Sequence, residues 1–307
     1  MRIHRDIPIP KDARGASVAL GNFDGVHLGH QAILRQAQAS ADAPLGVLTF
    51  EPHPRQVFRP EDAPFRLMNS DAKAHRLEKL GVSQLYEIAF DGALSALTPD
   101  AFAQEILVDG LGAAHVTVGA DFRFGKARAG NADILSQLGR EMGFGVTIAE
   151  LLTDDGTNVS STRIRQALQS GEPRKAAEML GHLHRIEGPV IQGDQRGRDL
   201  GYPTANMALE GLLLPKLGVY AVQVEILDGP FEGICPGVAS LGTRPMFGDN
   251  VPNLETFLFD FSGDLYGTPL SVGLVEYLRP ELKFDGLAAL IAQMDADSAQ
   301  ARAILGA

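Results

Sequence analysis

The chain is poor in the residues that mark secreted and membrane-bound proteins. Its 307 residues include one cysteine, Cys235, and no tryptophan. A single cysteine cannot form an internal disulfide, which favours a reducing compartment. No apolar stretch approaches the length of a membrane span, and the first residues lead into no signal-peptide core. We therefore expect a cytoplasmic protein with no membrane partner.

Positive charge is also scarce. The chain has 27 Lys and Arg against 38 Asp and Glu, a formal net charge of −11. General nucleic-acid binding needs a basic surface, so we expect no nucleic-acid partner. A nucleotide would also be repelled unless basic residues gathered at its site. They do gather, in the three short segments Arg123–Arg128, Arg163–Arg165 and Arg196–Arg198.

The first half of the chain alternates short apolar runs with helical patterns. The expected strands are Val18–Leu20, Leu45–Phe50, Gln84–Ile88, His115–Val118 and Val146–Ala149, and the expected helices span 31–39, 72–80, 99–107 and 132–142. This alternation predicts a mainly parallel sheet covered by helices. In such a sheet, ligands bind at the carboxyl ends of the strands.

Near Gly171 the pattern changes. After expected helices at 162–169 and 173–180, strands are expected at Pro189–Ile191, Val219–Ile226, Gly237–Leu241, Leu254–Phe261 and Leu270–Tyr277, with a final helix at 287–305. Short strands separated by Gly- and Pro-rich turns predict an antiparallel barrel. The expected fold class is therefore α/β plus β. We place the domain boundary near His182, which gives domains 1–181 and 182–307.

The segment Gly21–His30 reads GNFDGVHLGH and follows the apolar run Ser17–Leu20. This order predicts a strand, a glycine-bracketed turn and the start of a helix. His27 and His30 are three residues apart, so they share one face beside the helix N-terminus. Backbone N–H groups and the helix dipole favour an anion there. We interpret the segment as a phosphate site; a polar turn with two surface histidines is the alternative.

This decapeptide resembles the nucleotide-binding signature of the His-x-Gly-His nucleotidyltransferases, in the form carried by bacterial FMN adenylyltransferases. The pieces TFEPHP (49–54), GADFRFG (119–125) and VSSTRIR (159–165) follow in the order that this family shows. Later, GRDLGYPTAN (197–206) resembles the riboflavin kinase signature, and LET (254–256) and DLYG (264–267) match its later half. Over nearly its whole length the chain resembles the prokaryotic bifunctional riboflavin kinase/FMN adenylyltransferases, or FAD synthetases.

The resemblance implies an N-terminal parallel-sheet nucleotidyltransferase (Rossmann-like) domain and a C-terminal antiparallel β-barrel riboflavin kinase domain with a terminal helix. The implied enzyme phosphorylates riboflavin to FMN with ATP, then adenylylates FMN to FAD and releases pyrophosphate. Mg²⁺ is expected to accompany ATP, and riboflavin, FMN and ATP are the expected small-molecule partners. FMN and FAD would be substrate or product, not prosthetic groups. A monomer or weak homo-oligomer is expected.

Adenylyl transfer needs little proton movement, so catalysis depends on positioning and on neutralising charge. His27 and His30 could hydrogen-bond the triphosphate, and the resemblance assigns Arg165 to a phosphate. The expected nucleotide- and flavin-binding residues of this domain are Gly21, Asn22, Phe23, Asp24, Gly25, His53, Asp121, Phe122, Phe124, Ser160, Ser161 and Thr162. Two alternatives stay open. The Ser-Ser-Thr run could serve only as a helix cap, and His53, between two prolines, could be a structural turn residue.

Phosphorylating a hydroxyl needs a metal on the phosphates and a base for the proton. Thr204 and Asn206 are two apart, so both project to one side of an extended chain and offer oxygen donors suited to Mg²⁺. Glu255 is the candidate base. In the expected strand Leu254–Phe261 it shares a face with the aromatic residues Phe257, Phe259 and Phe261, which would partly desolvate the carboxylate and make it more basic. An edge-strand glutamate facing water is the alternative. The resemblance adds Gly197, Arg198 and Gly201 as cofactor-binding residues.

The chain departs from the family pattern in three places. Phe257 stands where many members carry His, Met246 replaces a common Thr, and His182–His184 differs from the frequent Arg-Pro-Tyr. These departures motivate a second hypothesis, in which only the adenylyltransferase is active and the barrel is a flavin-binding regulatory module. A non-enzymatic flavin or nucleotide sensor is a third. The presence of Thr204, Asn206 and Glu255 favours the bifunctional enzyme.

Overall fold

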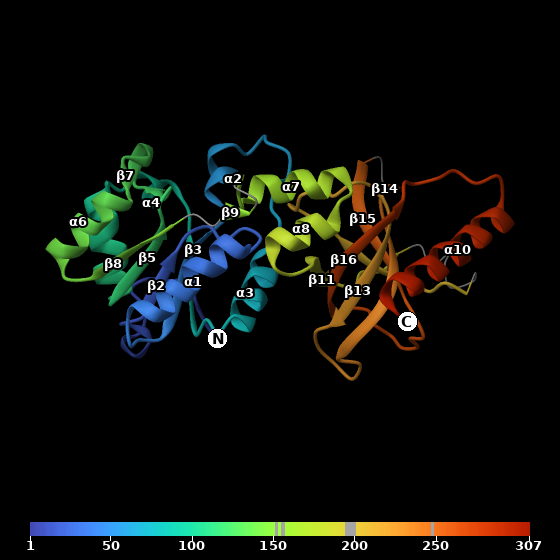
Figure 1. Ribbon diagram of the computed structural model, residues 1–307, viewed down its shortest axis with the longest axis horizontal. Coiled ribbons are helices and arrows are strands. Elements are labelled where there is room, and N and C mark those ends of the chain that lie inside the picture. Colours follow the sequence, from blue (N-terminus) through green and yellow to red (C-terminus); the bar gives the residue numbers. More distant parts are fainter. Residues whose placement is uncertain (151–152, 155–156, 194–200, 247–248) are drawn as a thin grey trace. The chain divides into compact units, whose positions relative to one another are not determined.

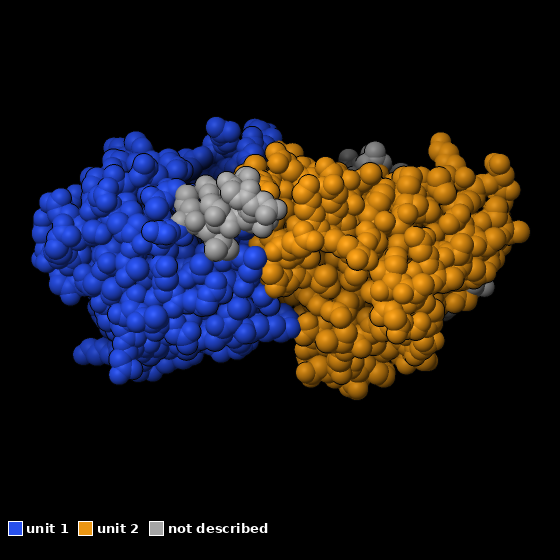
Figure 2. Space-filling view, viewed as in Figure 1, with its two compact units in different colours: residues 1–62, 73–160 blue, residues 63–72, 161–307 orange. Residues whose placement is uncertain are grey.

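The computed structural model describes residues 1–150, 153–154, 157–193, 201–246 and 249–307 (Figure 1). The chain divides into two compact units, one of residues 1–62 and 73–160 and the other of residues 63–72 and 161–307 (Figure 2). The second unit begins ahead of His182 and also includes a short segment from the first half of the chain. Our functional boundary at residues 181 and 182 stays a prediction.

A six-stranded parallel sheet forms the centre of the first unit. Its strand order is β1-β4-β3-β2-β5-β8. The strands are β1 (Arg2–His4), β2 (Ser17–Leu20), β3 (Leu45–Glu51), β4 (Gln84–Ala89), β5 (His115–Gly119) and β8 (Gly145–Ala149). The five predicted strands are all present. Strands β2, β3, β4 and β5 are largely buried apolar runs inside the sheet, whereas β8 lies at its edge and is only partly buried. The sequence reading missed β1, a three-residue edge strand with polar residues at both ends.

Helices and short segments connect these strands. The helices are α1 (Leu28–Ser40), α2 (Pro54–Phe58), α3 (Ser70–Lys79), α4 (Gly92–Ala96), α5 (Pro99–Ala101), the π-type helix η2 (Phe102–Gly110) and α6 (Ala132–Met142). The short segments are η1 (Lys11–Ala13), β6 (Arg123–Phe124), η3 (Lys126–Arg128), β7 (Gly130–Asn131), β9 (Thr153–Asp154) and β10 (Thr157–Asn158). The expected helix at 99–107 is therefore two successive helices, and the second continues to Gly110.

The second unit is an antiparallel six-stranded barrel with helices at its start and end. Its strand order is β11-β16-β13-β14-β15-β12. The strands are β11 (His184–Pro189), β12 (Ala205–Ala208), β13 (Gly218–Ile226), β14 (Gly233–Met246), β15 (Asp249–Leu258) and β16 (Pro269–Arg279). Helices α7 (Ser161–Ser170) and α8 (Pro173–Leu180) precede them, and α10 (Leu287–Leu305) follows them. An isolated bridge between Ile191 and Asn206 nearly closes the barrel. The predicted fold class is confirmed.

Several strand boundaries in the barrel were predicted wrongly. Strand β14 is longer at both ends than the expected Gly237–Leu241, β15 begins at Asp249 and not at Leu254, and β12 was not predicted. The expected strand Pro189–Ile191 overlaps only the last residue of β11, which begins at His184. There His184 and Ile186 are buried while Arg185 between them is more exposed. Strand β15 ends at Leu258, three residues before the expected Phe261. Asp260 has φ of +54°, which no continuing strand can accommodate.

Among the described residues, no helix is long and apolar enough to cross a bilayer.

His184 links the stability of the second unit to pH. It is 4 % exposed, and burial, reinforced by His182, lowers its pKa from 6.5 to about 3. Below pH 6.5 the His184 imidazole is therefore protonated in the unfolded chain, whereas in the folded chain it stays neutral down to about pH 3. The free energy of unfolding is therefore unaffected by His184 above pH 6.5. Between pH 6.5 and 3 it falls by about 1.4 kcal/mol for each pH unit, because protons bind only to the unfolded chain.

We expect wild type to lose about 2 kcal/mol more than His184→Gln between pH 6.5 and 5, as measured by urea unfolding followed by circular dichroism. His75→Gln, in the other unit, is the control and should keep the wild-type slope. Parallel pH profiles for wild type and His184→Gln would contradict the assignment.

Candidate active sites

The turn between β2 and α1 holds two side chains in unusual backbone conformations. Phe23 has φ of +51° and Val26 has φ of +42°, and both side chains are fully buried. Left-handed backbone is unfavourable for a β-branched residue, so packing must hold Val26 there. Gly25, at φ +87°, takes the same region without that cost. The turn is therefore a fixed, locally strained structure, as binding loops often are.

His27 and His30 lie against each other at the start of α1. His27 is the N-cap residue, and its Nδ1 accepts a hydrogen bond from the His30 backbone N–H at 3.3 Å. The two rings stack with centroids 3.7 Å apart, and Phe23 lies 5.1 Å from His30. A Cβ on Gly29 would come within 3.1 Å of the His27 ring, so glycine lets the ring fold over the turn. His27 Nδ1 is an acceptor, which places the proton of the neutral ring on Nε2.

His30 is set up as a neutral imidazole. Burial, the neighbouring His27 and the Lys73 ammonium lower its pKa well below the ordinary value of 6.5. Its Nδ1 is buried and makes no hydrogen bond within the described part of the chain. A buried ring nitrogen without a partner is costly unless something binds it. Together with the N–H groups of the helix start, it suits a phosphate oxygen.

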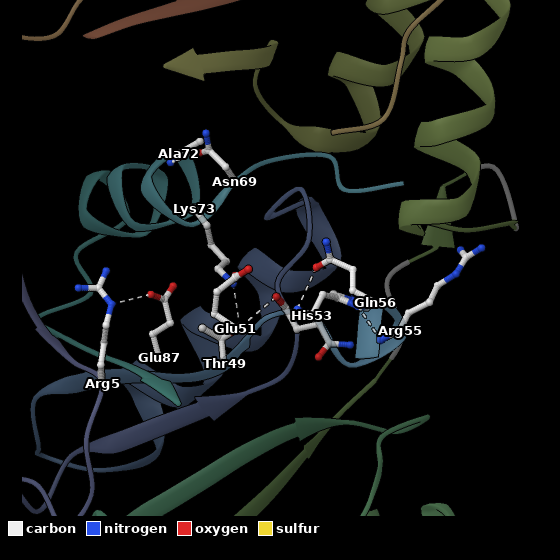
Figure 3. A network of polar contacts seen from close by, with 11 residues as sticks. Arg5, Thr49, Glu51, His53, Arg55, Gln56, Asn69, Ala72, Lys73 and Glu87 are labelled. Atoms are coloured by element: carbon white, nitrogen blue, oxygen red, sulfur yellow. Dashed lines mark hydrogen bonds and ion pairs between the residues drawn. The ribbon is translucent and has the colours of Figure 1, made fainter. Parts of the chain in front are cut away.

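Sequence reasoning missed a buried lysine behind this turn. Lys73 points from α3 toward β3 (Figure 3), where its Nζ donates to Thr49 Oγ1 at 3.2 Å and lies 3.6 Å from Glu51 Oε2. Thr49 Oγ1 in turn donates to the Asn22 carbonyl at 3.1 Å. A signal was present, because Lys73 occupies the apolar stripe of its helix with Leu77 at i+4.

Three predicted loops leave the same edge of the sheet. The Gly21–His30 turn follows β2, His53 follows β3, and the Asp121 loop follows β5, and these strands are neighbours in the sheet. Asp121 is exposed, Phe122 is half-buried and Phe124 is buried. This is the edge at which parallel sheets bind ligands.

His53 has a structural role in this loop. It caps α2, its Nδ1 accepting from the Arg55 N–H at 3.1 Å while its own N–H donates to Gln56 Oε1 (Figure 3). His53 therefore does act as a structural turn residue, one of the two roles considered for it from the sequence. A substrate-side role for the other ring nitrogen stays a prediction.

The Ser-Ser-Thr-x-Ile-Arg segment lies where the two units meet in the sequence. Ser160 ends the first unit, and Ser161, Thr162 and Arg165 belong to α7 in the second. Arg165 is half-buried; its Nε donates to the Phe65 carbonyl at 2.7 Å, and its guanidinium lies 5.3 Å from the Phe65 ring. Its assignment to a phosphate stays a prediction.

In the barrel, the candidate base and one metal-side donor occupy adjacent strands. Glu255 on β15 is directly opposite Asn206 on β12. Directly opposite residues of an antiparallel pair project from the same face, so these two side chains are neighbours. Asn206 is 6 % exposed, and its Oδ1 accepts from Asn253 Nδ2 at 3.0 Å. Thr204 lies two residues before it, just ahead of β12.

The aromatic surroundings of Glu255 differ in part from the prediction. Phe257 does share its face, and Phe259 stays beside Phe257, with ring centroids 5.9 Å apart. Phe261 does not, because β15 has ended; it packs instead against Phe231 and the main barrel core. Tyr202 lies 4.8 Å from Phe257 and is a further aromatic neighbour that sequence reasoning missed.

A pocket of about 270 Å³ opens beside these strands. Thr204 and Asn206 line it, together with Phe261, Asp264 and Tyr266. Among the described residues no cluster of three His, Cys, Asp or Glu could hold a metal. A hydroxyl and an amide oxygen nevertheless fit Mg²⁺, which is commonly held by few protein ligands plus phosphates and water. Gly197 and Arg198 lie outside the described residues, and Gly201 is exposed in the loop before Thr204.

Comparison with known proteins matches both halves of the chain. The FAD synthetase family model matches residues 9–163, and the riboflavin kinase model matches residues 180–305. Proteins described as bifunctional riboflavin kinase/FMN adenylyltransferase are similar throughout. The one from Pseudomonas fluorescens is 43 % identical over 95 % of this chain and 93 % of its own. Those from Escherichia coli K12 and Bacillus subtilis are 38 % and 35 % identical over 99 % and 95 % of this chain and 96 % and 93 % of their own.

A solved structure is similar as well. The crystal structure of a protein described as a macrolide-efflux protein from Streptococcus pneumoniae superposes with a TM-score of 0.80 and 32 % identity, covering 95 % of this chain and 94 % of that one. The family-model matches and the curated relatives agree on the two activities, and the family models place the FAD synthetase match ahead of the riboflavin kinase match along the chain. The chain therefore belongs to the family of bifunctional riboflavin kinase/FMN adenylyltransferases, the FAD synthetases.

Proposed function

We propose that the two activities of this enzyme reside at two separate sites, with FMN adenylyltransferase in residues 1–181 and riboflavin kinase in residues 182–307. The observation that carries this proposal is that each half brings together side chains that we predict to bind phosphates or to activate a hydroxyl. His27 and His30 stack at a helix N-terminus in one half, and Glu255 stands opposite Asn206 in the other. Riboflavin, FMN and ATP are the proposed substrates.

In the first site, a phosphate oxygen of FMN attacks the α-phosphorus of ATP. A P–O bond forms, the bond between the α-phosphorus and the bridging oxygen breaks, and pyrophosphate leaves. The nucleophile is already an anion, so no base is required. His27 and His30 donate hydrogen bonds to phosphate oxygens, and their contribution rises as charge develops on those oxygens. Asn22, Asp24 and Gly25 shape the backbone around the nucleotide, with Arg165 and the serines before it as further phosphate ligands.

A run of aromatic rings is proposed to support the flavin of the first site from below, because Phe50, Phe102 and Phe124 are buried and Phe58 is exposed. Phe58 on α2 contacts Phe90, and Phe90 contacts Phe50, at centroid distances of 5.5 and 5.8 Å. Phe124 packs against Phe122 at 5.6 Å with nearly parallel rings. Phe102 joins the two groups, lying 6.5 Å from Phe50 and 5.4 Å from Phe124. Phe58 is 66 % exposed, so its ring is accessible to a planar ligand.

In the second site, a ribityl hydroxyl of riboflavin attacks the γ-phosphorus of ATP. Glu255 accepts the hydroxyl proton as the new O–P bond forms, and ADP leaves. Phe257, two residues from Glu255 on the same strand, and Tyr202, which packs against Phe257, offer apolar surface to the flavin. Thr204 and Asn206 are the proposed protein ligands of Mg²⁺, which neutralises charge on the β- and γ-phosphates when bound.

Replacing the Thr204 hydroxyl should weaken the metal side of the kinase. We expect Thr204→Val to raise the Mg²⁺ concentration for half-maximal riboflavin phosphorylation by about 10- to 100-fold, because one oxygen ligand is lost. A magnesium titration of the kinase rate at saturating ATP measures this. Thr268→Val, elsewhere in the barrel, should leave the titration unchanged. If both variants matched wild type, Thr204 would not be a ligand.

The environment of the enzyme is proposed from its composition. Cys235 has no second cysteine with which to pair, and the net charge of −11 disfavours nucleic acid. We place the protein in the cytoplasm as a monomer or weak homo-oligomer, with no membrane or nucleic-acid partner. FMN and FAD pass through it as substrate and product.

Product analysis tests this proposal. Purified protein is incubated with ATP and Mg²⁺ and either riboflavin or FMN, and the flavins are separated by chromatography. Riboflavin should yield FMN and then FAD, and supplied FMN should yield FAD directly. FAD from FMN without any product from riboflavin would support the hypothesis of a regulatory barrel instead.

A further inference from the structure

Lys73 carries a charge in a place where lysine is seldom found. Its side chain is 2 % exposed, although it lies on α3 only one turn from the helix start. A lysine is almost never fully buried unless it is paired, because desolvating the ammonium is costly. Glu51, 3.6 Å away and 30 % exposed, offsets part of that cost. Packing alone therefore does not explain why a lysine is buried at this position.

The contacts of Lys73 lead to the phosphate-binding turn. An ammonium can only donate hydrogen bonds, so Thr49 Oγ1 is the acceptor at 3.2 Å. The Thr49 hydroxyl must then donate onward, and its acceptor is the Asn22 carbonyl at 3.1 Å. The hydrogen bonds of this relay all point one way, from Lys73 on α3 to Thr49 on β3 (Figure 3) and from Thr49 to Asn22 in the turn that carries His27. It fixes the backbone of the turn at its first polar residue.

The charge of Lys73 also acts on the histidine pair. His30 is faced by the His27 ring from its own helix start and by Lys73 from α3. Lys73 is faced by Glu51 from β3, and Asp24, 4 % exposed, lies in the same turn. Lys73 therefore supplies positive charge behind the turn while His30 stays neutral. A polyphosphate gains from that charge without the enzyme holding a protonated imidazole.

We propose that Lys73 is a positioning residue of the adenylyltransferase site, which holds the Asn22 carbonyl through Thr49 and places a buried positive charge behind His27 and His30. It touches neither substrate nor reacting atoms. The proposal rests on the proposed assignment of His30 to adenylyl transfer.

The rate of FAD formation from FMN tests the positioning role. Lys73→Met keeps the length of the side chain and removes the charge, and we expect the adenylylation kcat to fall by about 10- to 100-fold. Thr49→Val keeps the charge and breaks only the relay, so a smaller loss in the same rate is expected. Lys79→Met, on the exposed part of the same helix, is the matched control. Riboflavin phosphorylation and the thermal unfolding of the first unit, followed by circular dichroism, check that each variant is folded.

A titration of His30 separates an electrostatic role from mere packing. In Lys73→Met, loss of the positive neighbour should raise the pKa of His30, read from its ring proton by NMR in the free enzyme. In Glu51→Gln, the Lys73 ammonium loses the carboxylate that faces it, so its unbalanced positive charge should lower the pKa of His30 further. Loosened packing would instead raise it in both variants.

The inference is overturned if Lys73→Met and Thr49→Val keep wild-type adenylylation, or if the two titrations move in the same direction. His30→Ala separates the assignment of the adenylyltransferase site from the role of Lys73 within it. Wild-type FAD formation in His30→Ala would overturn the site assignment itself. A strong loss in His30→Ala beside unchanged Lys73→Met would overturn only the role of Lys73.

Discussion

His30→Ala is expected to abolish FAD formation from FMN while FMN formation from riboflavin continues at nearly the wild-type rate. His30 stacks on His27 at 3.7 Å, and its buried Nδ1 has no hydrogen-bond partner in the described structure. Removing the imidazole takes away a hydrogen-bond donor that we propose for phosphate oxygens, and it leaves His27 without its neighbour. The loss of one such preorganised donor is worth about 10²–10³-fold in kcat, and disturbing the pair adds to it.

The control for this variant is Gln36→Ala, an exposed position on the same helix. Both proteins are assayed separately with FMN and with riboflavin, in the presence of ATP and Mg²⁺. Gln36→Ala should keep both activities. Loss of both activities in a folded His30→Ala protein would mean that one site performs both reactions, against the proposed division.

Glu255→Gln should give the converse pattern. The substitution keeps the shape and hydrogen-bonding reach of the side chain but removes the basic carboxylate. Riboflavin phosphorylation should fall by about 10²–10⁴-fold, the usual contribution of a general base. Adenylylation of supplied FMN should hardly change, because the attacking phosphate needs no base. The affinity for Mg²⁺·ATP should also persist if Thr204 and Asn206 are the donors on the metal side.

Glu232→Gln, an exposed loop position in the same unit, is the matched control and should retain kinase activity. Initial rates of FMN production at saturating riboflavin and ATP give the comparison. Full kinase turnover by Glu255→Gln would exclude it as the base. Asp199, five residues before Thr204 in the sequence and outside the described residues, would then be tested as the base.

Local pattern predicted most of the fold because the relevant signals lie close together in the sequence. Helices α6 and α8 have the predicted bounds, since each begins and ends at a strong local signal, such as Pro173 at the start of α8 and Gly143 after α6. Strand ends were harder. Phe261 continues the alternation of β15 in the sequence, but the left-handed Asp260 ends the strand before it. The presence of an aspartate at position 260 does not by itself predict a left-handed backbone there.

The residues of the candidate sites were likewise predicted where their signal is local in the sequence, and missed where folding brings distant residues together. Gly21–His30 was found from sequence because strand, turn and helix start are contiguous there. Lys73 was missed because its contacts with Thr49 and Glu51 span more than twenty residues of sequence and exist only once β3 and α3 pack together. The opposition of Glu255 and Asn206 is likewise set by strand register, which spacing along one chain cannot give.

Mixing the two variants tests the central claim, that one chain holds two independent sites. Alone, His30→Ala should convert riboflavin to FMN and stop, and Glu255→Gln should leave riboflavin almost unchanged. Combined with riboflavin, ATP and Mg²⁺, they should form FAD, because FMN released by the first protein is adenylylated by the second. Chromatography of the flavins over time reads the result. FAD in the mixture is the predicted outcome; FMN that accumulates without FAD, although Glu255→Gln adenylylates supplied FMN, would contradict it.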